Sequence, residues 1–309
     1  MKVIQRTQKN DIATVYVAET ENKRMIEFVE SIQPPYSIKE KWILLVSLLF
    51  GCPVKCKFCD AGGDYKGKLT AEQIMFQIDY MVKKRFPSNY IDVDKFKIQF
   101  ARMGEPTFNK AVLEVLEEIP QKYKFKNFIP SLSTIAPCGV DDFFFSLLEI
   151  KDRLYRENFQ LQFSIHSTNE KQRDNLTPIK KWDFQKIADY GNQFYNHGNR
   201  KITLNFALAK DSIVDPETLI RFFDPQKFLI KITPVNPTFN AKANNIESLI
   251  HADFEELEII HDLRETGFEV ILSFGELEEN RIGSNCGQYI HSLKNKVPLN
   301  AYTYALEEV

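Results

Sequence analysis

The chain has 309 residues, a hydrophobic fraction of 43% and a formal net charge of −2 at pH 7. This length allows one large domain of the barrel class or two small domains. The charge excludes a protein that is basic overall, as many nucleic-acid binders are. The first ten residues lack the apolar core of a signal peptide, and no apolar run approaches the ~18 residues of a membrane span. We therefore expect a soluble protein of the cytoplasm that makes no contact with a membrane.

Residues 1–38 are expected to form a small extension in front of the main domain. The segments "IATVYVAE" (12–19) and "KRMIEFVE" (23–30) alternate between apolar and polar residues, and the polar stretch "TENK" lies at their junction. Alternation with a period of two on both sides of a short polar turn predicts a β-hairpin.

Residues 39–309 are expected to form a barrel domain with a C-terminal strand and tail. The first strand, "WILLVSLLF" (42–50), is a near-continuous apolar run, which is typical of a buried parallel strand. Further strands are predicted at 96–100, 127–135, 159–166, 201–209, 228–236 and 268–274. Helices are predicted between them, at about 70–84, 110–123, 141–156, 182–195, 216–223 and 253–267. This alternation indicates a parallel sheet and an α/β fold, a partial (β/α)6 TIM-like barrel.

Two helix boundaries have specific signals. Thr70 and Gln73 have the spacing of a capping box at the start of the first helix. Gly267 follows the last helix, at the position where a left-handed residue commonly ends a helix.

Three of the five cysteines lie in one loop, "GCPVKCKFCDAGG", directly after the first strand of the barrel. An odd number of cysteines, clustered in this way, argues against a disulfide framework and for a metal site. Structural zinc requires four ligands, and an ordinary [4Fe–4S] cluster requires four cysteines. Cys52, Cys56 and Cys59 are only three, so one iron of a cluster would remain open to a small molecule. A zinc site or a chance pattern is the alternative.

Polar residues follow several of the predicted strands, at the end of a barrel where active sites gather. They are found in "RMGEP" (102–106), at Ser133, in "SIH" (164–166) and at Asn236. Each of them alone is most often a turn residue. Glu105 differs, because a carboxylate beside Gly104 can accept the ammonium group of a ligand that approaches the backbone closely.

The spacing C-x3-C-x2-C is the signature of the radical S-adenosylmethionine (SAM) enzymes, and Phe58 is the aromatic residue usual before the third cysteine. More specifically, the chain resembles the RlmN/Cfr family of radical SAM methyl synthases, which methylate adenine carbons in ribosomal RNA and, for some members, in tRNA. The resemblance extends from about residue 25 to residue 288 through ordered motifs: "GCPVKCKFCDAG", "MGEPTFN", "LSTIAP", "FSIHSTNEKQRDNLTPI", "ITPVNP" and "SNCGQY".

The resemblance implies a radical SAM barrel, two cofactors and a role for each matching residue. Cys52, Cys56 and Cys59 would hold a [4Fe–4S] cluster. Seven residues would contact SAM: Gly104, Glu105, Ser133, Ser164, Ile165, His166 and Asn236. Cys286 would be methylated on sulfur and then donate the carbon, and Glu27 would be the base. The resemblance also implies an RNA substrate and an electron donor such as flavodoxin or ferredoxin.

A radical route suits the implied reaction, because the ring carbon to be methylated is electrophilic and a polar methyl transfer cannot reach it. A methylthioether converted to a carbon radical can add to the ring, and a base can then remove the ring proton. The alternative for Cys286 is a small buried hydrophobic residue, and the alternative for Glu27 is a solvent-facing residue of the hairpin.

Two departures set the chain apart from the family. The second catalytic cysteine of these enzymes, seven residues before the cluster loop, is replaced by Leu45, and the only unassigned thiol is Cys138. Only about 50 residues precede the loop, so the resemblance does not include the family's N-terminal RNA-binding extension. Two other functions therefore stay open: a divergent radical SAM enzyme that acts on another substrate through a 5′-deoxyadenosyl radical, and a non-catalytic RNA- or protein-binding relative that keeps the cluster as structure.

Overall fold

The computed structural model describes residues 1–9, 11–250, 258–273, 275, 277–284, 288–295 and 304–309. In this part of the chain one sheet of eleven strands has the order β12-β11-β10-β9-β8-β6-β4-β3-β2-β1-β13, and β5 and β7 form a second, two-stranded sheet. The strands are β1 (Lys2–Lys9), β2 (Ala13–Glu19), β3 (Met25–Ser31), β4 (Trp42–Val46), β5 (Tyr90–Ile91), β6 (Phe96–Phe100), β7 (Lys124–Phe125), β8 (Phe128–Thr134), β9 (Gln160–Ser164), β10 (Ile202–Leu208), β11 (Phe228–Pro234), β12 (Glu269–Leu272) and β13 (Glu307–Glu308).

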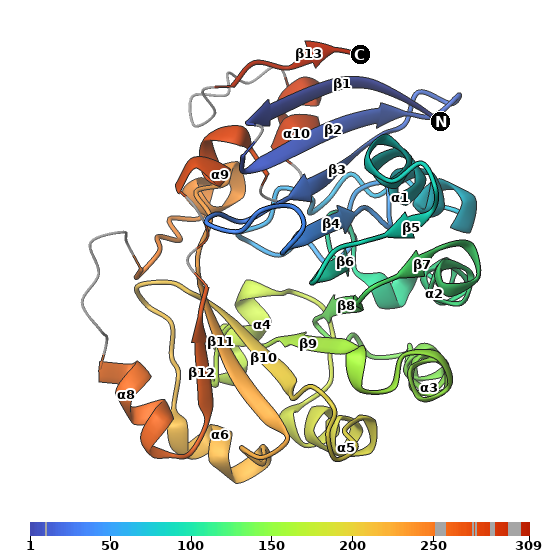
Figure 1. Ribbon diagram of the computed structural model, residues 1–309. Coiled ribbons are helices and arrows are strands. Elements are labelled where there is room, and N and C mark those ends of the chain that lie inside the picture. The colour runs from blue at the N-terminus through green and yellow to red at the C-terminus, as the bar shows by residue number, and fades with distance from the viewer. Residues whose placement is uncertain (10, 251–257, 274, 276, 285–287, 296–303) are drawn as a thin grey trace.

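The strands from β4 to β12 form the barrel part of the large sheet, and all their pairings are parallel. Each strand lies beside the next barrel strand along the chain, and the connecting helices cover the outer face of the curved sheet (Figure 1). The six predicted strands and the final one are therefore confirmed, as a TIM-like partial barrel with one additional parallel strand.

The helices are mostly those that the sequence indicates. They are α1 (Ala71–Arg85), α2 (Ala111–Lys122), α3 (Asp141–Ile150), α4 (Glu170–Leu176), α5 (Phe184–Phe194), α6 (Pro216–Phe222), α7 (Phe239–Ala243), α8 (Glu258–Glu265), α9 (Leu277–Ile282) and α10 (Gln288–Asn295). The capping box at Thr70 is formed, and Gly267 after α8 has a φ of 90°. None of the described helices has both the length and the apolar character that would let it cross a membrane.

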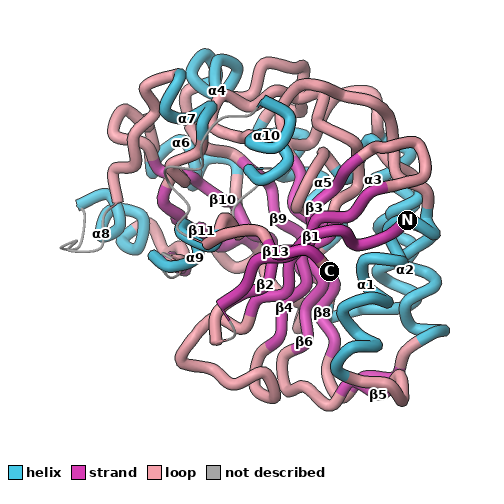
Figure 2. The backbone as a smooth tube through the Cα atoms, turned by 90° about the horizontal axis from the view of Figure 1, so that it is seen from above, coloured by secondary structure: helices cyan, strands magenta, loops and turns pink. Residues whose placement is uncertain are grey.

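The N-terminal strands extend the barrel sheet on its β4 side. β2 and β3 form the expected antiparallel hairpin, and β3 pairs antiparallel with β4. The sheet is thus continuous across residue 38, and the domain boundary placed there stays a prediction. β1 was not predicted, because few of its residues are apolar and its burial is confined to Val3 and Thr7. β13 pairs with β1, which brings the two ends of the chain close together (Figure 2).

Several of the barrel strands alternate, with apolar residues on the outer face and polar residues on the inner face. In β6, Phe96, Ile98 and Phe100 are fully buried in the main apolar cluster, together with residues of α1 and α2. Lys97 of the same strand donates a hydrogen bond to Gln160 of β9, 2.8 Å away. Since neighbouring residues of a strand point to opposite faces, the barrel interior is built from polar side chains, which can line a binding site at its end.

Candidate cofactor-binding site

The cysteine loop leaves the end of β4 and returns at the start of α1. Asn109 closes its base, because its side-chain amide donates hydrogen bonds to the carbonyl oxygens of Leu48 and Leu69, at 2.9 and 2.8 Å. Gly51 turns the chain into the loop with a φ of 76°, and a Cβ atom at this position would lie 2.5 Å from the carbonyl oxygen of Gly63. Glycine is therefore required at position 51 by both conformation and space.

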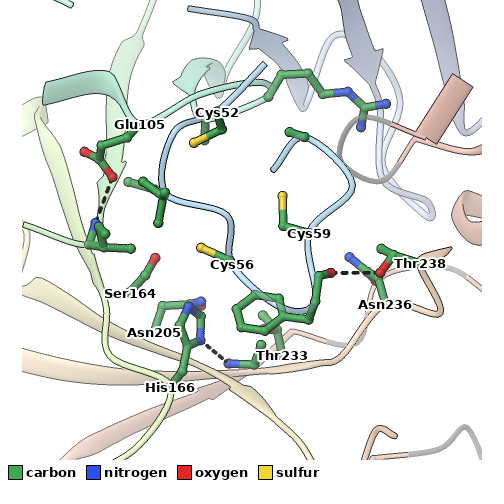
Figure 3. A pocket seen from close by; sticks show the side chains of 18 of the residues that line it. Cys52, Cys56, Cys59, Glu105, Ser164, His166, Asn205, Thr233, Asn236 and Thr238 are labelled. Atoms are coloured by element: carbon green, nitrogen blue, oxygen red, sulfur yellow. Dashed lines mark hydrogen bonds between the residues drawn. The ribbon is translucent and has the colours of Figure 1, made fainter. Parts of the chain in front are cut away.

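The loop borders a cavity of about 400 Å³ at the carboxyl ends of the barrel strands. Figure 3 shows the cysteines along the loop, with residues of several strands around them. The cavity is lined by nine of the predicted site residues: Cys52, Cys56, Cys59, Gly104, Glu105, Ser133, Ser164, His166 and Asn236. The structure thus brings together side chains that are spread over 185 residues of sequence, from Cys52 to Asn236.

The donor set of the loop tests which metal group fits. Three thiols and no fourth cysteine are among the described residues that line the cavity. A structural zinc site is closed by four protein ligands, whereas a [4Fe–4S] cluster on three cysteines would keep one iron open. The donor set therefore fits a group with an open coordination position. Burial raises the pKa of Cys52 to about 12 and that of Cys56 well above its ordinary value, and metal coordination deprotonates such thiols.

Gly104 and Glu105 follow β6 at the cavity wall. Gly104 has a φ of 99°, and a Cβ atom there would lie 2.4 Å from Cγ of Leu49. The carboxylate of Glu105 accepts hydrogen bonds from the hydroxyl groups of Thr107 (2.8 Å) and Thr134 (2.5 Å) and from the backbone N–H of Ile135 (3.0 Å). Burial raises the pKa of Glu105, and these hydrogen bonds oppose the rise. They also fix the carboxylate in one orientation at the cavity.

His166 follows the strand β9 by two residues and has a φ of 63°, which is uncommon for a residue other than glycine. Its Nδ1 accepts a hydrogen bond from the backbone N–H of Ala207, at 3.1 Å. Burial, and secondarily the charge of Arg173, lowers the pKa of His166 to about 3. The imidazole is therefore neutral at pH 7 with its proton on Nε2. The ring of Phe58 packs edge-on against it at 4.9 Å, so the residue before Cys59 contacts the pocket wall.

Of the predicted site residues that the structure describes, two are not among those that line the cavity. Ile165 is completely buried in the main apolar cluster beside the site. Glu27 is completely buried in β3, so the alternative of a solvent-facing residue is wrong. Cys286 lies outside the described residues. The roles predicted for these three side chains stay predictions.

Glu27 forms a buried ion pair that the sequence did not reveal. Its carboxylate lies 2.6 Å from Nη2 of Arg102, and Arg102 itself lines the cavity with 1% of its side chain exposed. Arg102 also donates hydrogen bonds to the carbonyl oxygens of Gly283 and Ser284. This guanidinium therefore joins the N-terminal hairpin, the cavity wall and the start of the "SNCGQ" motif at Ser284.

The structure places Leu45, which stands where the family has its second cysteine, and Cys138, the unassigned thiol, in different surroundings. Leu45 is half-buried in β4 and packs on a second apolar cluster that includes Val29 and Tyr289. Cys138 is exposed in the loop after β8 and is not among the residues that line the cavity. Its position gives no support to a thiol that replaces the missing cysteine.

Several cavity residues were not predicted from the sequence. They include Arg102, Asn205, Thr233 and Thr238. A signal for two of them was present, because Asn205 and Thr233 occupy alternate polar positions in otherwise apolar strands, which marks the inward face of a barrel. No comparable pattern distinguishes Arg102 or Thr238.

The chain is similar to bacterial RNA-modifying enzymes along most of its length. Proteins named probable dual-specificity RNA methyltransferase RlmN from Petrotoga mobilis and Pseudothermotoga lettingae are both 27% identical to it. These likenesses cover 76% and 77% of this chain and 64% and 66% of the two relatives, so the chain spans slightly less than two thirds of their length. The protein of that name from Thermotoga petrophila is 26% identical over 300 residues, 90% of this chain and 79% of the relative. No protein-family model matches the chain.

One solved structure has a similar fold. It is the crystal structure of a radical SAM methyltransferase from Sphaerobacter thermophilus, with a TM-score of 0.67 and 21% identity over 93% of this chain and 80% of that one. Taken with the three thiols and the barrel that carries them, these likenesses support an RlmN/Cfr-like family of radical SAM proteins for this chain.

Proposed function

We propose that the protein is a radical SAM methyltransferase that holds a [4Fe–4S] cluster on Cys52, Cys56 and Cys59, binds SAM in the adjoining cavity and acts on an RNA base. The observation that carries this proposal is the convergence of three thiols, two carboxylates (Glu105 and Glu279), one neutral histidine and further polar side chains on a single cavity. The names of the relatives support RNA as the substrate class.

The residues around the cavity suit the two cofactors in different ways. The three thiols leave a fourth coordination position unclaimed by cysteine among the described cavity residues. A [4Fe–4S] cluster bound there supplies one-electron reduction of SAM. Glu105 offers a carboxylate to the ammonium group of SAM, and the neutral His166 can donate from Nε2. Gly104 lines the cavity, and the space that a Cβ atom would take there is filled by Leu49.

Cys286 and Glu27 are assigned the remaining steps. Cys286 would accept the methyl group on its sulfur and pass the carbon to the ring of the RNA base. Glu27 would then take the proton that leaves this ring. The ion pair with Arg102 orients the carboxylate of Glu27. An electron donor such as flavodoxin or ferredoxin would reduce the cluster.

A second candidate function is a radical SAM reaction on a substrate other than ribosomal adenine. The observation in its favour is Leu45, which packs as an apolar residue where the related enzymes have a catalytic cysteine. A reaction that forms no covalent adduct between protein and RNA does not need a thiol at this position.

One experiment separates these possibilities. Protein reconstituted anaerobically with iron and sulfide is incubated with a reductant, SAM that carries a labelled methyl group and unmodified ribosomal RNA, and the products are digested and analysed by mass spectrometry. We expect cleavage of SAM and labelled methyladenosine. Cleavage of SAM without labelled RNA would favour the second candidate, and no cleavage in a fully reconstituted protein would favour the non-catalytic relative.

A further inference from the structure

The cysteine loop is held from one side by a short helix that belongs to none of the predicted motifs. This helix, α7 (Phe239–Ala243), follows the end of β11 and lies against residues 57–60. The side chain of Thr238 caps α7 by accepting a hydrogen bond from the N–H of Ala241. Its hydroxyl also donates to the carbonyl oxygen of Phe58, at 2.9 Å (Figure 3).

Three consecutive carbonyl groups of the loop are bound by side chains of this one segment. Thr238 binds that of Phe58, as described, and the side-chain amide of Asn240 donates to the carbonyl oxygen of Cys59, at 2.9 Å. The side-chain amide of Asn244 donates to the carbonyl oxygen of Lys57, at 3.0 Å. The peptide planes on both sides of Phe58 are thereby oriented, and with them the direction in which Cys59 leaves the backbone.

The loop holds α7 in return through Asp60, the residue directly after the third cysteine. Its two carboxylate oxygens accept hydrogen bonds from the backbone N–H groups of Phe239 (3.0 Å) and Asn240 (2.8 Å). Asp60 is 6% exposed, so these hydrogen bonds are largely shielded from water. Five hydrogen bonds in both directions therefore join two segments that are about 180 residues apart in sequence.

We propose that α7 is a latch for the cysteine loop, with Asp60, Thr238 and Asn240 as positioning residues that fix Cys56 and Cys59 for the cluster and set its reduction potential. The proposal rests on the proposed function in that it takes these cysteines as cluster ligands. The latch fixes the backbone that carries these sulfur atoms, and hydrogen bonding and solvent exposure around the sulfur atoms are what tune such a cluster.

The latch also ties the cluster loop to the predicted SAM contact at Asn236. The carbonyl oxygen of Asn236 accepts a hydrogen bond from the backbone N–H of Thr238, at 2.8 Å, so both residues belong to one turn. Both also line the cavity. A displacement of the cysteine loop would therefore displace this turn, and SAM and the cluster would keep a fixed relative position.

The test compares latch variants with matched controls that lose the same interactions elsewhere. Asn240→Ala is paired with Asn127→Ala, since Asn127 also donates its amide to a backbone carbonyl, that of Asp94. Asp60→Ala is paired with Asp215→Ala, since Asp215 also accepts two backbone N–H groups at the start of a short helix, α6. Each reconstituted variant is measured for its rate of iron loss to a chelator and for its reduction potential by electron paramagnetic resonance.

We expect Asn240→Ala and Asp60→Ala to lose iron at least about tenfold faster than the wild type, in line with the effect of removing outer partners of metal ligands, and to shift the reduction potential. Asn127→Ala and Asp215→Ala should match the wild type in both measurements. Latch variants that behave like the wild type, or controls that change as much as the latch variants, would overturn the latch.

A third position keeps the test decisive if a latch variant does not fold. Thr238→Ser keeps the hydroxyl, whereas Thr238→Val keeps the shape and loses it, so only the valine variant should lose iron faster. Equal rates for the two would overturn the latch. A wild-type protein that binds no iron after reconstitution would overturn the proposed function and the latch together, whereas a complete cluster with unaffected variants would overturn the latch alone.

Discussion

The two ends of the barrel interior contain buried ionisable groups of different kinds. At the carboxyl ends, thiols, Glu105 and His166 converge on a cavity, and Glu105 has four hydrogen bonds that hold it in place. Deeper in the barrel, Lys97 and Lys231 also point inward, and burial is the main cause that lowers the pKa of both. The charges of nearby cations lower these pKa values further.

The difference shows that a shifted pKa does not by itself locate a functional site. Both parts of the barrel interior contain groups with shifted pKa values. Only the part at the carboxyl ends of the strands combines such groups with a cavity and with hydrogen-bond donors from several strands. Lys97 instead donates to Gln160 within the barrel wall. We therefore assign catalysis to one end and a structural role to the other, and substitutions at each end can break or sharpen this assignment.

The largest effect is expected from the cysteines. Cys56→Ala should abolish the absorbance of the iron–sulfur cluster and reductive cleavage of SAM together, because two thiolates cannot hold the cluster. Cys138→Ala removes an exposed thiol that does not line the cavity and serves as the control. Ultraviolet–visible spectra and iron content after anaerobic reconstitution measure the first effect, and 5′-deoxyadenosine formation measures the second. A Cys56→Ala protein with a complete cluster would contradict the assignment of the site.

The buried ion pair at the cavity wall should have the next largest effect. Arg102→Met leaves the carboxylate of Glu27 buried without its cation, which costs about 3–5 kcal/mol of unfolding free energy. Arg85→Met is the control, because Arg85 is 30% exposed and its partner Glu30 keeps hydrogen bonds from Tyr16 and Trp42. Urea denaturation measures both variants.

The double variant Glu27→Gln with Arg102→Met should recover part of the loss, because it leaves no unpaired buried charge. A cost for Arg102→Met no larger than that for Arg85→Met would show that the pair does not stabilise the junction of hairpin and barrel.

Gly104 should show a smaller effect that is specific to the cavity. Gly104→Ala adds a Cβ atom 2.4 Å from Leu49 and also forces an alanine to a φ of 99°. Gly139→Ala is the control for conformation alone, because Gly139 has a φ of 83° and no atom within 4 Å of an added Cβ. We expect Gly104→Ala to cost about 1–3 kcal/mol more than Gly139→Ala, the range for overpacking.

Thermal or urea unfolding measures this difference. In a protein that already contains Leu49→Ala, the added cost of Gly104→Ala should be smaller, because the shorter side chain makes room for the added atom. Equal costs for the two glycine variants would show that Leu49 yields freely and that the close approach at the cavity is not required.

The sequence predicted the barrel well because its signals are local. Apolar runs and alternation located the barrel strands, and the capping box at Thr70 located the start of α1. Nine of the twelve predicted site residues line one cavity, because the motifs that named them follow consecutive strands of a parallel sheet, whose ends meet at one edge.

What could not be predicted depends on contacts between distant segments. The ion pair between Glu27 and Arg102 joins residues 75 positions apart, and nothing in either segment indicates the other. The helix α7 has five residues, too few to show a helical period, and its importance comes from contacts with a loop about 180 residues earlier. β1 is too polar to stand out as a strand, and the hairpin beside it is what stabilises it.

The last expected effect lies deep in the barrel, and it is a change in pH dependence and not a loss of stability at one pH. Burial and the neighbouring cations hold the pKa of Lys97 well below its ordinary value of 10.5 in the folded protein. Between the folded and unfolded pKa values the unfolded chain binds the proton and the folded protein does not. The free energy of unfolding must therefore rise with pH across this window, by at most about 1.4 kcal/mol per pH unit for one group.

Lys97→Met removes this contribution. Between pH 7.5 and pH 10 the unfolding free energy of the variant should therefore rise less steeply than that of the wild type, and the two slopes should differ by at most about 1.4 kcal/mol per pH unit. The control is Lys124→Met, which replaces an exposed lysine of β7, outside the barrel interior, and should keep the wild-type slope. Urea denaturation at several pH values measures all three proteins. The tyrosines titrate in all three, so their contribution cancels in the comparison. A Lys97→Met protein with the full wild-type slope would show that Lys97 keeps its ordinary proton affinity. A shifted pKa at Lys97 would then no longer be a property that the deep part of the barrel shares with the cavity.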